Sequence, residues 1–332
     1  MRRFRADDKP NSQRSRHYYN TRDSGPDTKY TAMYSHMLIE DMHLGIMPIG
    51  WQPNRFKFEC KIEPQSSSVE EMLKIGFPTQ HGEPRYLTEA ICDFVEQSTH
   101  ILASYGKAFY EIVYTYSDEN KTKIDGFKFS HVLNSNIHSW FGFYWQYIPK
   151  DARDRFADDG EDKKRFIWLP PKDIFVLSYP RQLGGVRRLR RTIDQLVWIS
   201  KETIPKFSMK DMELQKQQTG YEFSLYRENQ DIFVLKRTKN LGWPARSLSS
   251  EKLLEFYQLY RYLCFERAKA ILREHIIKEL NRTLIRVGKK VGFSAKIVLN
   301  NCYSSKDIDG YISQLIDGKL QFSEIIKITK FG

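Results

Sequence analysis

The chain has 332 residues, of which 40% are hydrophobic and 14% are aromatic. This composition excludes a wholly disordered chain and suggests about two domains, or one elaborated domain. Lysine and arginine, at 53 residues, outnumber aspartate and glutamate, at 41, so the formal net charge is +12. A charge of this sign and size predicts a polyanionic partner.

The N-terminal part is charged and polar and shows no signal-peptide pattern. No apolar run approaches the roughly 20 residues that a membrane-spanning helix requires. We therefore expect a protein that is made and used in a cytosol, without a membrane partner. Residues 1–30 lack an apolar period and are rich in Arg, Asp, Ser and Asn, which predicts a flexible basic arm. The arm would bind nucleic acid or a partner subunit, or would be a solvated tail.

Residues 31–187 are expected to form an α+β domain. Its clearest helix covers 88–105, where apolar residues share one face. Thr88 is expected to cap this helix, and Gly106 follows its end. Alternating runs of aromatic and β-branched residues then predict strands of an antiparallel or mixed sheet, at 108–116, 126–132, 140–147, 165–169 and 173–179. The charged stretch 151–164 predicts an exposed loop.

The character of the chain changes near Arg187. Residues 188–218 predict a helix that Pro205 kinks or divides. Residues 219–248 predict a short β hairpin, because YEFSLY and DIFVLKRTK are rich in aromatic and β-branched residues.

Residues 249–287 predict a long helix, capped by Ser249 or Ser250, whose apolar stripe packs against the 188–218 helix. A break near His275 stays open as an alternative. Residues 288–332 form a small C-terminal α/β region, with a predicted strand at 295–301 and a predicted helix at 306–316.

Catalytic and metal-binding motifs are not found. The sequence contains none of the patterns GxxxxGK[ST], GxGxxG, HExxH and GxSxG. No CxxC pair occurs, so neither a zinc cluster nor a disulfide framework is expected of Cys60, Cys92, Cys264 and Cys302. One acidic cluster lacks the spacing of an EF-hand loop and is interpreted as a solvated loop, at Asp158, Asp159, Glu161 and Asp162. We expect no metal, no cofactor and no catalytic residue.

A nuclease-like site is a weak alternative to this conclusion. His131 and His138 lie near Asn134 and Asn136 in the segment HVLNSNIHSW. Two ordinary histidines around the end of a strand are the favoured interpretation, so the hypothesis of an enzyme is the weaker one.

Basic residues are the strongest functional signal. One group contains Arg187, Arg188, Arg190 and Arg191, and a second contains Lys236, Arg237 and Lys239. Cations at a helix start oppose the helix macrodipole, so local stability does not explain the first group. Phosphate contacts require only suitably placed Lys and Arg and carry no sequence preference. Both groups are therefore candidate contacts with nucleic acid or a partner, although a solvated surface with internal ion pairs is the alternative for any one of them.

The order of the motifs resembles that of the portal proteins of tailed bacteriophages. A helix runs through a glycine turn into an aromatic strand at ASYGKAFYEIVY (103–114), and a proline phrase leads a later strand at WLPPKDIFVLSYP (168–180). A loop then enters an arginine-bearing helix at GGVRRLRRTIDQL (184–196). The long helix carries HIIKELNRTL (275–284), and GKLQFSE (318–324) follows. The resemblance implies an α+β wing, paired stem helices, a short β clip and a small C-terminal region.

The resemblance also implies a function. Portal proteins form a homo-oligomeric ring, typically a dodecamer, at one capsid vertex, through which double-stranded DNA passes during packaging and ejection. It implies as partners the terminase large subunit, a head–tail adaptor and the major capsid protein. The expected location is the virion, after assembly in the host cytoplasm, and the protein itself would hydrolyse nothing. The alternative from a different class is a monomeric or dimeric intracellular nucleic-acid-binding protein without ring assembly.

Overall fold

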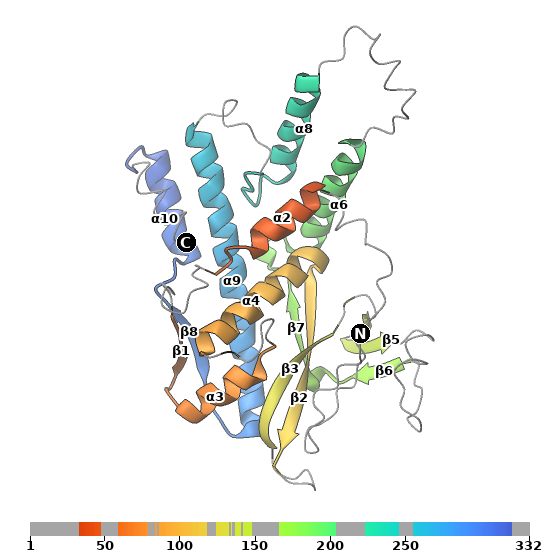
Figure 1. Ribbon diagram of the computed structural model, residues 1–332, viewed down its shortest axis with the longest axis vertical. Coiled ribbons are helices and arrows are strands. Elements are labelled where there is room, and N and C mark those ends of the chain that lie inside the picture. Colours follow the sequence, from red (N-terminus) through yellow and green to blue (C-terminus); the bar gives the residue numbers. More distant parts are fainter. Residues whose placement is uncertain are drawn as a thin grey trace. The chain divides into compact units, whose positions relative to one another are not determined.

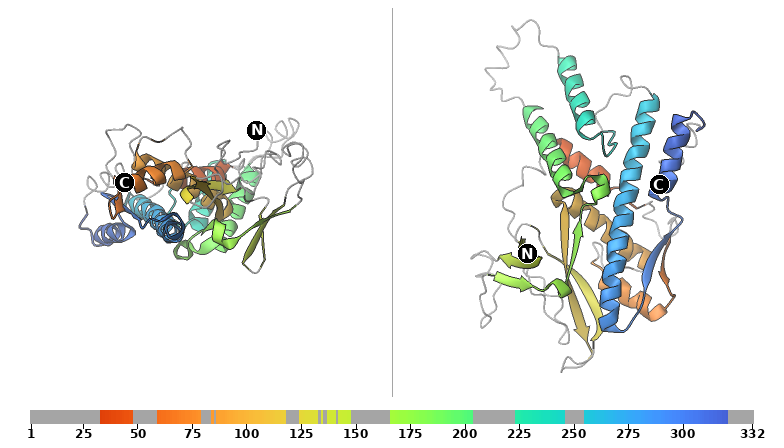
Figure 2. Two further views of the ribbon diagram at one scale, coloured as in Figure 1. Left: turned by 90° about the horizontal axis from the view of Figure 1, so that it is seen from below. Right: turned by 180° about the vertical axis from the view of Figure 1, so that it is seen from behind.

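The computed structural model describes residues 33–47, 59–78, 84, 86–117, 124–132, 134, 137–140, 142–147, 166–203, 223–245 and 255–320. These residues form helices and antiparallel sheets (Figures 1 and 2), so the predicted α+β class is confirmed. The arm predicted at 1–30, the loop predicted at 151–164 and the caps predicted at Ser249 or Ser250 lie outside the described residues.

The chain divides into two compact units. Of the described residues, unit 1 contains those of 45–179 and 272–302, and unit 2 contains those of 26–44, 180–271 and 303–332. The sequence predicted a different division, with boundaries at 187, 218, 248 and 287. The two divisions differ because segments far apart in sequence pair with each other, which local patterns do not reveal.

Unit 1 is built around a three-stranded antiparallel sheet in the order β3-β2-β7. The strands are β2 (Lys107–Tyr116), β3 (Ile124–Val132) and β7 (Ile174–Ser178), which confirms three predicted strands. Helix α4 (Leu87–Tyr105) precedes β2 and packs on this sheet. It ends at Gly106, whose left-handed φ of 78° is a conformation that glycine adopts without strain.

The start of α4 differs from the prediction. Its N-cap residue is Tyr86, which makes no side-chain cap hydrogen bond. The Thr88 hydroxyl instead accepts a hydrogen bond of 3.2 Å from the backbone N–H of Cys60. Thr88 therefore ties the helix to β1 rather than capping it, a long-range role that the local sequence does not indicate.

A second antiparallel sheet of unit 1 has the order β4-β5-β6. The single strand predicted at 140–147 is wrong, since the chain forms β4 (Ile137–Trp140) and β5 (Phe143–Tyr147) around Gly142. Gly142 has a φ of 81°, which is typical of a hairpin turn. The aromatic residues on both sides favour a strand and made this turn hard to predict from the sequence. Strand β6 (Phe166–Leu169) confirms the strand predicted at 165–169.

The remaining strands of unit 1 come from opposite ends of the chain. Strand β1 (Glu59–Glu63), followed by α3 (Ser67–Gly76), pairs antiparallel with β8 (Lys296–Asn300), which confirms the strand predicted at 295–301. Asn281 holds β8 to helix α9, because its side chain bonds both the N–H and the carbonyl of Ile297 at 2.8 Å.

Helix α9 (Glu255–Val291) is continuous past His275 and contributes residues to both units. Its C-terminal half is joined to the start of β7 in unit 1. Arg286 donates 2.8 Å to the carbonyl of Ile174, and Lys290 contacts the Asp173 carboxylate at 3.1 Å. The predicted long helix is thus confirmed over the residues that the structure describes, and the alternative of a break is excluded there.

Unit 2 is helical among its described residues. It contains α2 (Met33–His43), α6 (Gly185–Thr203), α8 (Phe223–Arg237), the first part of α9 and α10 (Ser305–Ile316). The predicted C-terminal helix is confirmed, and it starts with a capping box formed by Ser304 and Asp307. Helix α6 ends at Thr203, before Pro205, and the rest of the predicted 188–218 helix lies outside the described residues.

The β hairpin predicted within 219–248 is wrong, because residues 223–237 form helix α8. The run DIFVL is rich in β-branched and aromatic residues, but its burial follows a helical period. Val234, Leu235 and Thr238 are buried, whereas Ile232 and Lys236 are exposed. Packing against another helix overrides the intrinsic preference of these residues for strands.

The helix pairing also differs from the prediction. Helix α6 packs chiefly on α2 and α8 rather than on the long helix. The backbone N–H of Tyr34 donates to the Ser200 hydroxyl at 3.1 Å, which joins α2 to α6. The first part of α9 packs instead on α10, through a core of Leu263, Ala270, Ile308 and Leu315. The paired helices are therefore α6 and α8.

Candidate functional site

The start of α6 is set by a compact turn. After Pro180, a single 3-10 turn, η3 (Arg181–Leu183), leads into Gly184 and Gly185, which have φ values of 94° and 67°. Both values lie in the left-handed region that favours glycine. A Cβ atom at Gly184 would collide with the side chain of Arg188. The two glycines therefore allow a sharp change of direction directly before the arginines.

The four arginines occupy the first turns of α6, where the sequence placed them. Arg187, Arg188, Arg190 and Arg191 are all exposed, and the first turn contains no acidic residue. The opposite face of the helix is buried at Leu189, Ile193, Leu196 and Val197. The macrodipole gives these cations no local stabilisation, so an external anion remains the best explanation for their position.

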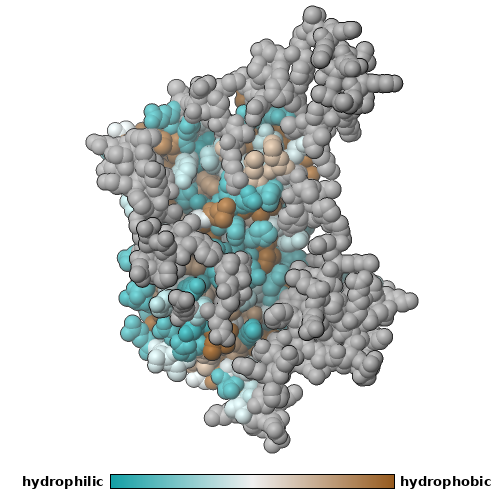
Figure 3. Space-filling model, viewed as in Figure 1, coloured by the Kyte–Doolittle hydropathy of each residue, from teal (hydrophilic) through white to brown (hydrophobic). Residues whose placement is uncertain are grey.

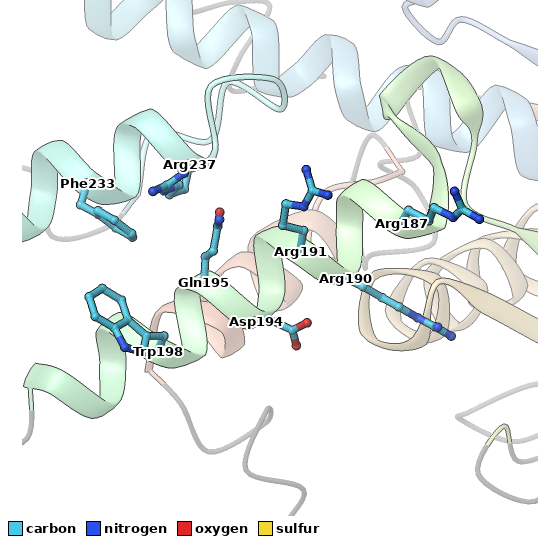
Figure 4. A pocket seen from close by; sticks show the side chains of 8 residues that line it. All are labelled: Arg187, Arg190, Arg191, Asp194, Gln195, Trp198, Phe233 and Arg237. Atoms are coloured by element: carbon cyan, nitrogen blue, oxygen red, sulfur yellow. The ribbon is translucent and has the colours of Figure 1, made fainter.

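Helix α8 brings the second basic group to the same place. Phe233 and Arg237 of α8 face α6, and the Arg237 guanidinium lies 4.6 Å from the centre of the Phe233 ring (Figure 4). Trp198 of α6 packs against the other side of this arrangement, with its ring centre 5.7 Å from that of Phe233. Although it touches Phe233, Trp198 stays 55% exposed.

These side chains line a cavity of about 680 Å³ between α6 and α8, entirely within unit 2. We call it the arginine pocket, and its lining residues are Arg187, Arg190, Arg191, Asp194, Gln195, Trp198, Phe233 and Arg237. Four guanidinium groups against a single carboxylate make it electropositive. Guanidinium groups bind phosphate or carboxylate in a bidentate manner, and the two rings add surfaces on which planar groups stack.

The structure separates the predicted site residues into two sets. Arg187, Arg190, Arg191 and Arg237 meet in the arginine pocket, although the sequence placed the last of these in a separate hairpin. Arg188 lies over the Gly184 turn, and the exposed Lys236 and Lys239 do not line the pocket. The same-face spacing from Arg187 to Asp194 and Trp198 on α6 was visible in the sequence, whereas Phe233 required α8 to be identified as a helix.

The nuclease alternative finds no support in the geometry. His131 of β3 is partly buried, and this burial lowers its pKa to about 4. His138 lies in a different sheet, exposed beside Trp145. The Asn134 side chain donates to the backbone carbonyl of Lys107, and Asn136 lies outside the described residues. Among the described residues, the two histidines thus lie in different sheets and have different ring neighbours, Tyr110 for His131 and Trp145 for His138.

All four cysteines are free thiols. No group of three or more His, Cys, Asp or Glu residues in the described ranges could hold a metal ion, and the acidic cluster at 158–162 lies outside them. In the same ranges, no helix combines the length and the apolar character that crossing a membrane requires.

No protein-family model and no curated protein matches this sequence. Solved structures to which this chain is similar include "Virion of native gene transfer agent (GTA) particle", with 10% identity, a TM-score of 0.46 and coverage of 95% of this chain and 96% of the other. "Neck of empty GTA particle computed with C6 symmetry" has 10% identity, a TM-score of 0.44 and coverage of 95% and 96%. "Neck of native GTA particle computed with C12 symmetry" has 10% identity, a TM-score of 0.44 and coverage of 93% and 94%. At this level of identity and overlap, the similarity does not identify the function of this chain.

Proposed function

We propose that this chain is a portal-type subunit, which forms a homo-oligomeric ring, a dodecamer, at one capsid vertex of a phage-like particle. Double-stranded DNA passes through the ring during packaging and ejection. The terminase large subunit, a head–tail adaptor and the major capsid protein are its proposed partners. In this role the protein resides in the virion, is assembled in the host cytoplasm and hydrolyses nothing.

The order and type of the elements support this proposal. The phrase ASYGKAFYEIVY forms the end of α4, the Gly106 turn and β2, as the resemblance implies. The phrase WLPPKDIFVLSYP contains β7, and GGVRRLRRTIDQL opens α6. The α6–α8 pair supplies the two packed helices expected of a stem, although α8 takes the place that the sequence gave to the long helix.

The single observation that carries the proposal is the arginine pocket. Four arginines from helices α6 and α8 line one exposed surface, and local helix stability opposes rather than explains those at the start of α6. A DNA conduit must not hold the duplex tightly, because the duplex has to slide. Contacts with backbone phosphates, made without reading the bases, satisfy this requirement.

Particle size tests the proposal directly. A ring of many 39.4 kDa chains sediments at hundreds of kilodaltons and gives annular particles in negative-stain electron micrographs. A wild-type protein that sediments as a monomer or dimer at every concentration, and that forms no ring when DNA is added, would overturn it.

One observation favours a second candidate, a monomeric or dimeric nucleic-acid-binding protein. The exposed Trp198 lies beside Phe233 and the guanidinium of Arg237, and aromatic rings beside cations are typical of surfaces that stack unpaired bases. This candidate requires tighter binding of single-stranded than of double-stranded DNA, with quenching of Trp198 fluorescence. The ring proposal requires assembly and no such preference.

A further inference from the structure

Figure 3 shows apolar residues interspersed with hydrophilic ones on the described part of one face. Four large apolar side chains that are exposed lie together on the β4-β5-β6 sheet of unit 1, at Trp140, Phe143, Phe166 and Trp168. Residue pairs in register place His138, Trp145 and Trp168 on one face of this sheet. Side chains alternate along a strand, so residues two positions away from these three, on the same strands, lie on the same face. We call it the aromatic face, and its rings are those of His138, Trp140, Phe143, Trp145, Tyr147, Phe166 and Trp168.

The opposite face of this sheet already has its packing partners. Ile137, Tyr144 and Ile167 pack on a buried cluster that includes Phe109 and Val132. The aromatic face is therefore directed away from this core. Its rings are exposed to an extent that core rings are not, with exposed fractions of 66% for Trp140, 46% for Phe143, 52% for Phe166 and 49% for Trp168.

The rings on the aromatic face form an arranged surface rather than isolated side chains. The Phe143 and Trp168 rings are tilted against each other with their centres 5.2 Å apart, and the Tyr147 and Phe166 rings lie 5.6 Å apart. A contiguous exposed apolar patch of this kind marks an interaction site in soluble proteins. The face is thus suited to a partner that ring surfaces recognise.

The charge of the sheet indicates which partner. The three strands read IHSW, FYWQY and FIWL and contain no Lys, Arg, Asp or Glu. Platforms that stack nucleic-acid bases combine rings with a basic groove along the backbone, and these strands supply no such cations. A partner that brings its own cations fits better, because ring faces attract guanidinium groups.

The chain contains a segment of this chemistry in its N-terminal arm. Residues 14–22, RSRHYYNTR, hold three arginines, a histidine and two tyrosines and no acidic residue. Nine residues extend over at most about 30 Å, which exceeds the roughly 17 Å of a five-residue strand. The chain elsewhere places Arg237 over the ring of Phe233, at 4.6 Å, which is the contact that this segment would make repeatedly.

We propose that the aromatic face of one subunit binds residues 14–22 of a neighbouring copy. The inference depends on the proposed ring, in which every junction between subunits repeats the same contact. Residues 14–22 contain no aliphatic side chain, so the neighbouring subunit supplies the apolar surface of this contact.

Photo-crosslinking in the full chain tests this proposal. Tyr19 is replaced by p-benzoylphenylalanine, and chains labelled with nitrogen-15 are mixed with unlabelled chains before assembly. The ring fraction is isolated by sedimentation, irradiated and digested for mass spectrometry. We expect crosslinks between heavy and light chains from position 19 to peptides that contain 137–147 or 166–169.

Two sets of variants identify the contact. Phe143→Ser with Trp168→Ser should reduce these crosslinks to less than about a tenth, whereas Tyr86→Ser, at another exposed ring of unit 1, should leave them unchanged. Arg14, Arg16 and Arg22 changed together to Gln should give the same loss while the aromatic face itself keeps its sequence. Their change to Lys should give a smaller loss, because Lys keeps the charge but not the planar stacking group.

The outcomes separate the two proposals. A ring fraction that forms normally but gives crosslinks only within one chain, only to other peptides, or none at all overturns the docking and leaves the ring proposal standing. A wild-type protein that never assembles overturns the ring proposal and, with it, the neighbouring copy as the occupant of the aromatic face.

Discussion

Aromatic rings gather in two regions of this molecule with opposite surroundings. In unit 1, Phe94 of α4 packs on Tyr110, Phe129 and Phe175 of the β3-β2-β7 sheet, with ring centres 5.2 to 6.3 Å apart. In unit 2, Trp198 and Phe233 also lie 5.7 Å apart, but Trp198 is 55% exposed whereas Phe94 is 0% exposed. The spacing of the rings is similar, and the difference is in what surrounds them.

Burial and charge therefore distinguish the two uses of similar side chains. The core rings of unit 1 are enclosed by other apolar groups, and their area is removed from water, which stabilises the fold. The rings of the arginine pocket line the same surface as four guanidinium groups, and Trp198 remains 55% exposed, so we expect these rings to contribute less to folding and more to recognition. Substitutions in the core of unit 1 should therefore lower the free energy of unfolding, whereas substitutions in the arginine pocket should weaken binding.

The largest effect on stability is expected for Phe94→Ala. It removes a ring that is 0% exposed and leaves a cavity between α4 and the sheet, which should lower the free energy of unfolding by about 3–5 kcal/mol. Trp198→Ala is the matched control and should lower it by less than about 1 kcal/mol, since surface substitutions have small effects. Urea denaturation followed by circular dichroism measures both, and equal losses would contradict the distinction between the regions.

The next effect depends on pH and on His131, whose ring packs against Tyr110 at 5.6 Å. Burial lowers the pKa of His131 to about 4, so the unfolded state takes up a proton more readily than the folded state. The stability that the uncharged His131 gives to the fold is fully present above its ordinary pKa of 6.5. As the pH falls from there to about 4, up to about 3 kcal/mol of stability is lost.

The matched control for this effect is His131→Phe, which keeps a ring and removes the titration. The difference in unfolding free energy between wild type and variant should change between pH 6.5 and 4. The comparison with the variant is necessary because Glu96 titrates over an overlapping pH range. Burial raises the pKa of Glu96 to about 7, so the stability that its protonated form gives to the fold is lost as the pH rises toward 7, in both proteins alike. A difference that is independent of pH would show that His131 charges as easily in the folded protein as in the unfolded chain.

A smaller effect is expected at the hydrogen bond inside the aromatic core. The hydroxyls of Ser98 and Tyr110 lie 2.8 Å apart and both residues are buried. Tyr110→Phe removes one of the two groups and should cost about 1–2 kcal/mol, because it takes a hydrogen-bond partner from a buried hydroxyl. The double variant with Ser98→Ala should cost less than the two single changes together. Strict additivity would indicate that the two hydroxyls do not stabilise each other.

The two regions also differ in how far the sequence predicts them. Strands β2, β3 and β7 and helix α4 follow from periodicity and from Gly106, because each is specified by its own residues. The pairing of β1 with β8 does not follow, since the two strands are more than two hundred residues apart. The turn at Gly142 was missed for the opposite reason, because aromatic residues on both sides concealed a single local signal.

For the arginine pocket, the sequence identified the charges and not the geometry. The arginines of α6 stand out by number and by their unfavourable position at a helix start. Phe233 and Arg237 reach them only because 223–237 is a helix, and the β-branched run DIFVL indicated a strand. Intrinsic preference failed where packing against α6 decides the conformation, so two of the eight lining residues, Phe233 and Arg237, were assigned to a separate hairpin.

The smallest effect on stability and the largest on binding are expected for the four arginines at 187, 188, 190 and 191. Their combined change to Gln should leave the unfolding free energy within about 1 kcal/mol of wild type, because the buried side of α6 at Leu189, Ile193 and Leu196 is untouched. DNA association should weaken. Its dependence on salt should also flatten, since each phosphate contact that is lost removes about 0.9 from the slope of log K against log salt concentration.

A matched control separates the position of these charges from the net charge. Changing four exposed lysines of unit 1 to Gln, at Lys172, Lys278, Lys289 and Lys296, removes the same amount of charge. If the arginine pocket contacts DNA, only the arginine variant should show the reduced salt slope while both variants still form rings. If the arginines instead bridge neighbouring subunits, the arginine variant should fail to assemble before DNA is added. Equal behaviour of the two variants in assembly and in DNA binding would mean that these arginines are a solvated surface, and the proposed contact would be wrong.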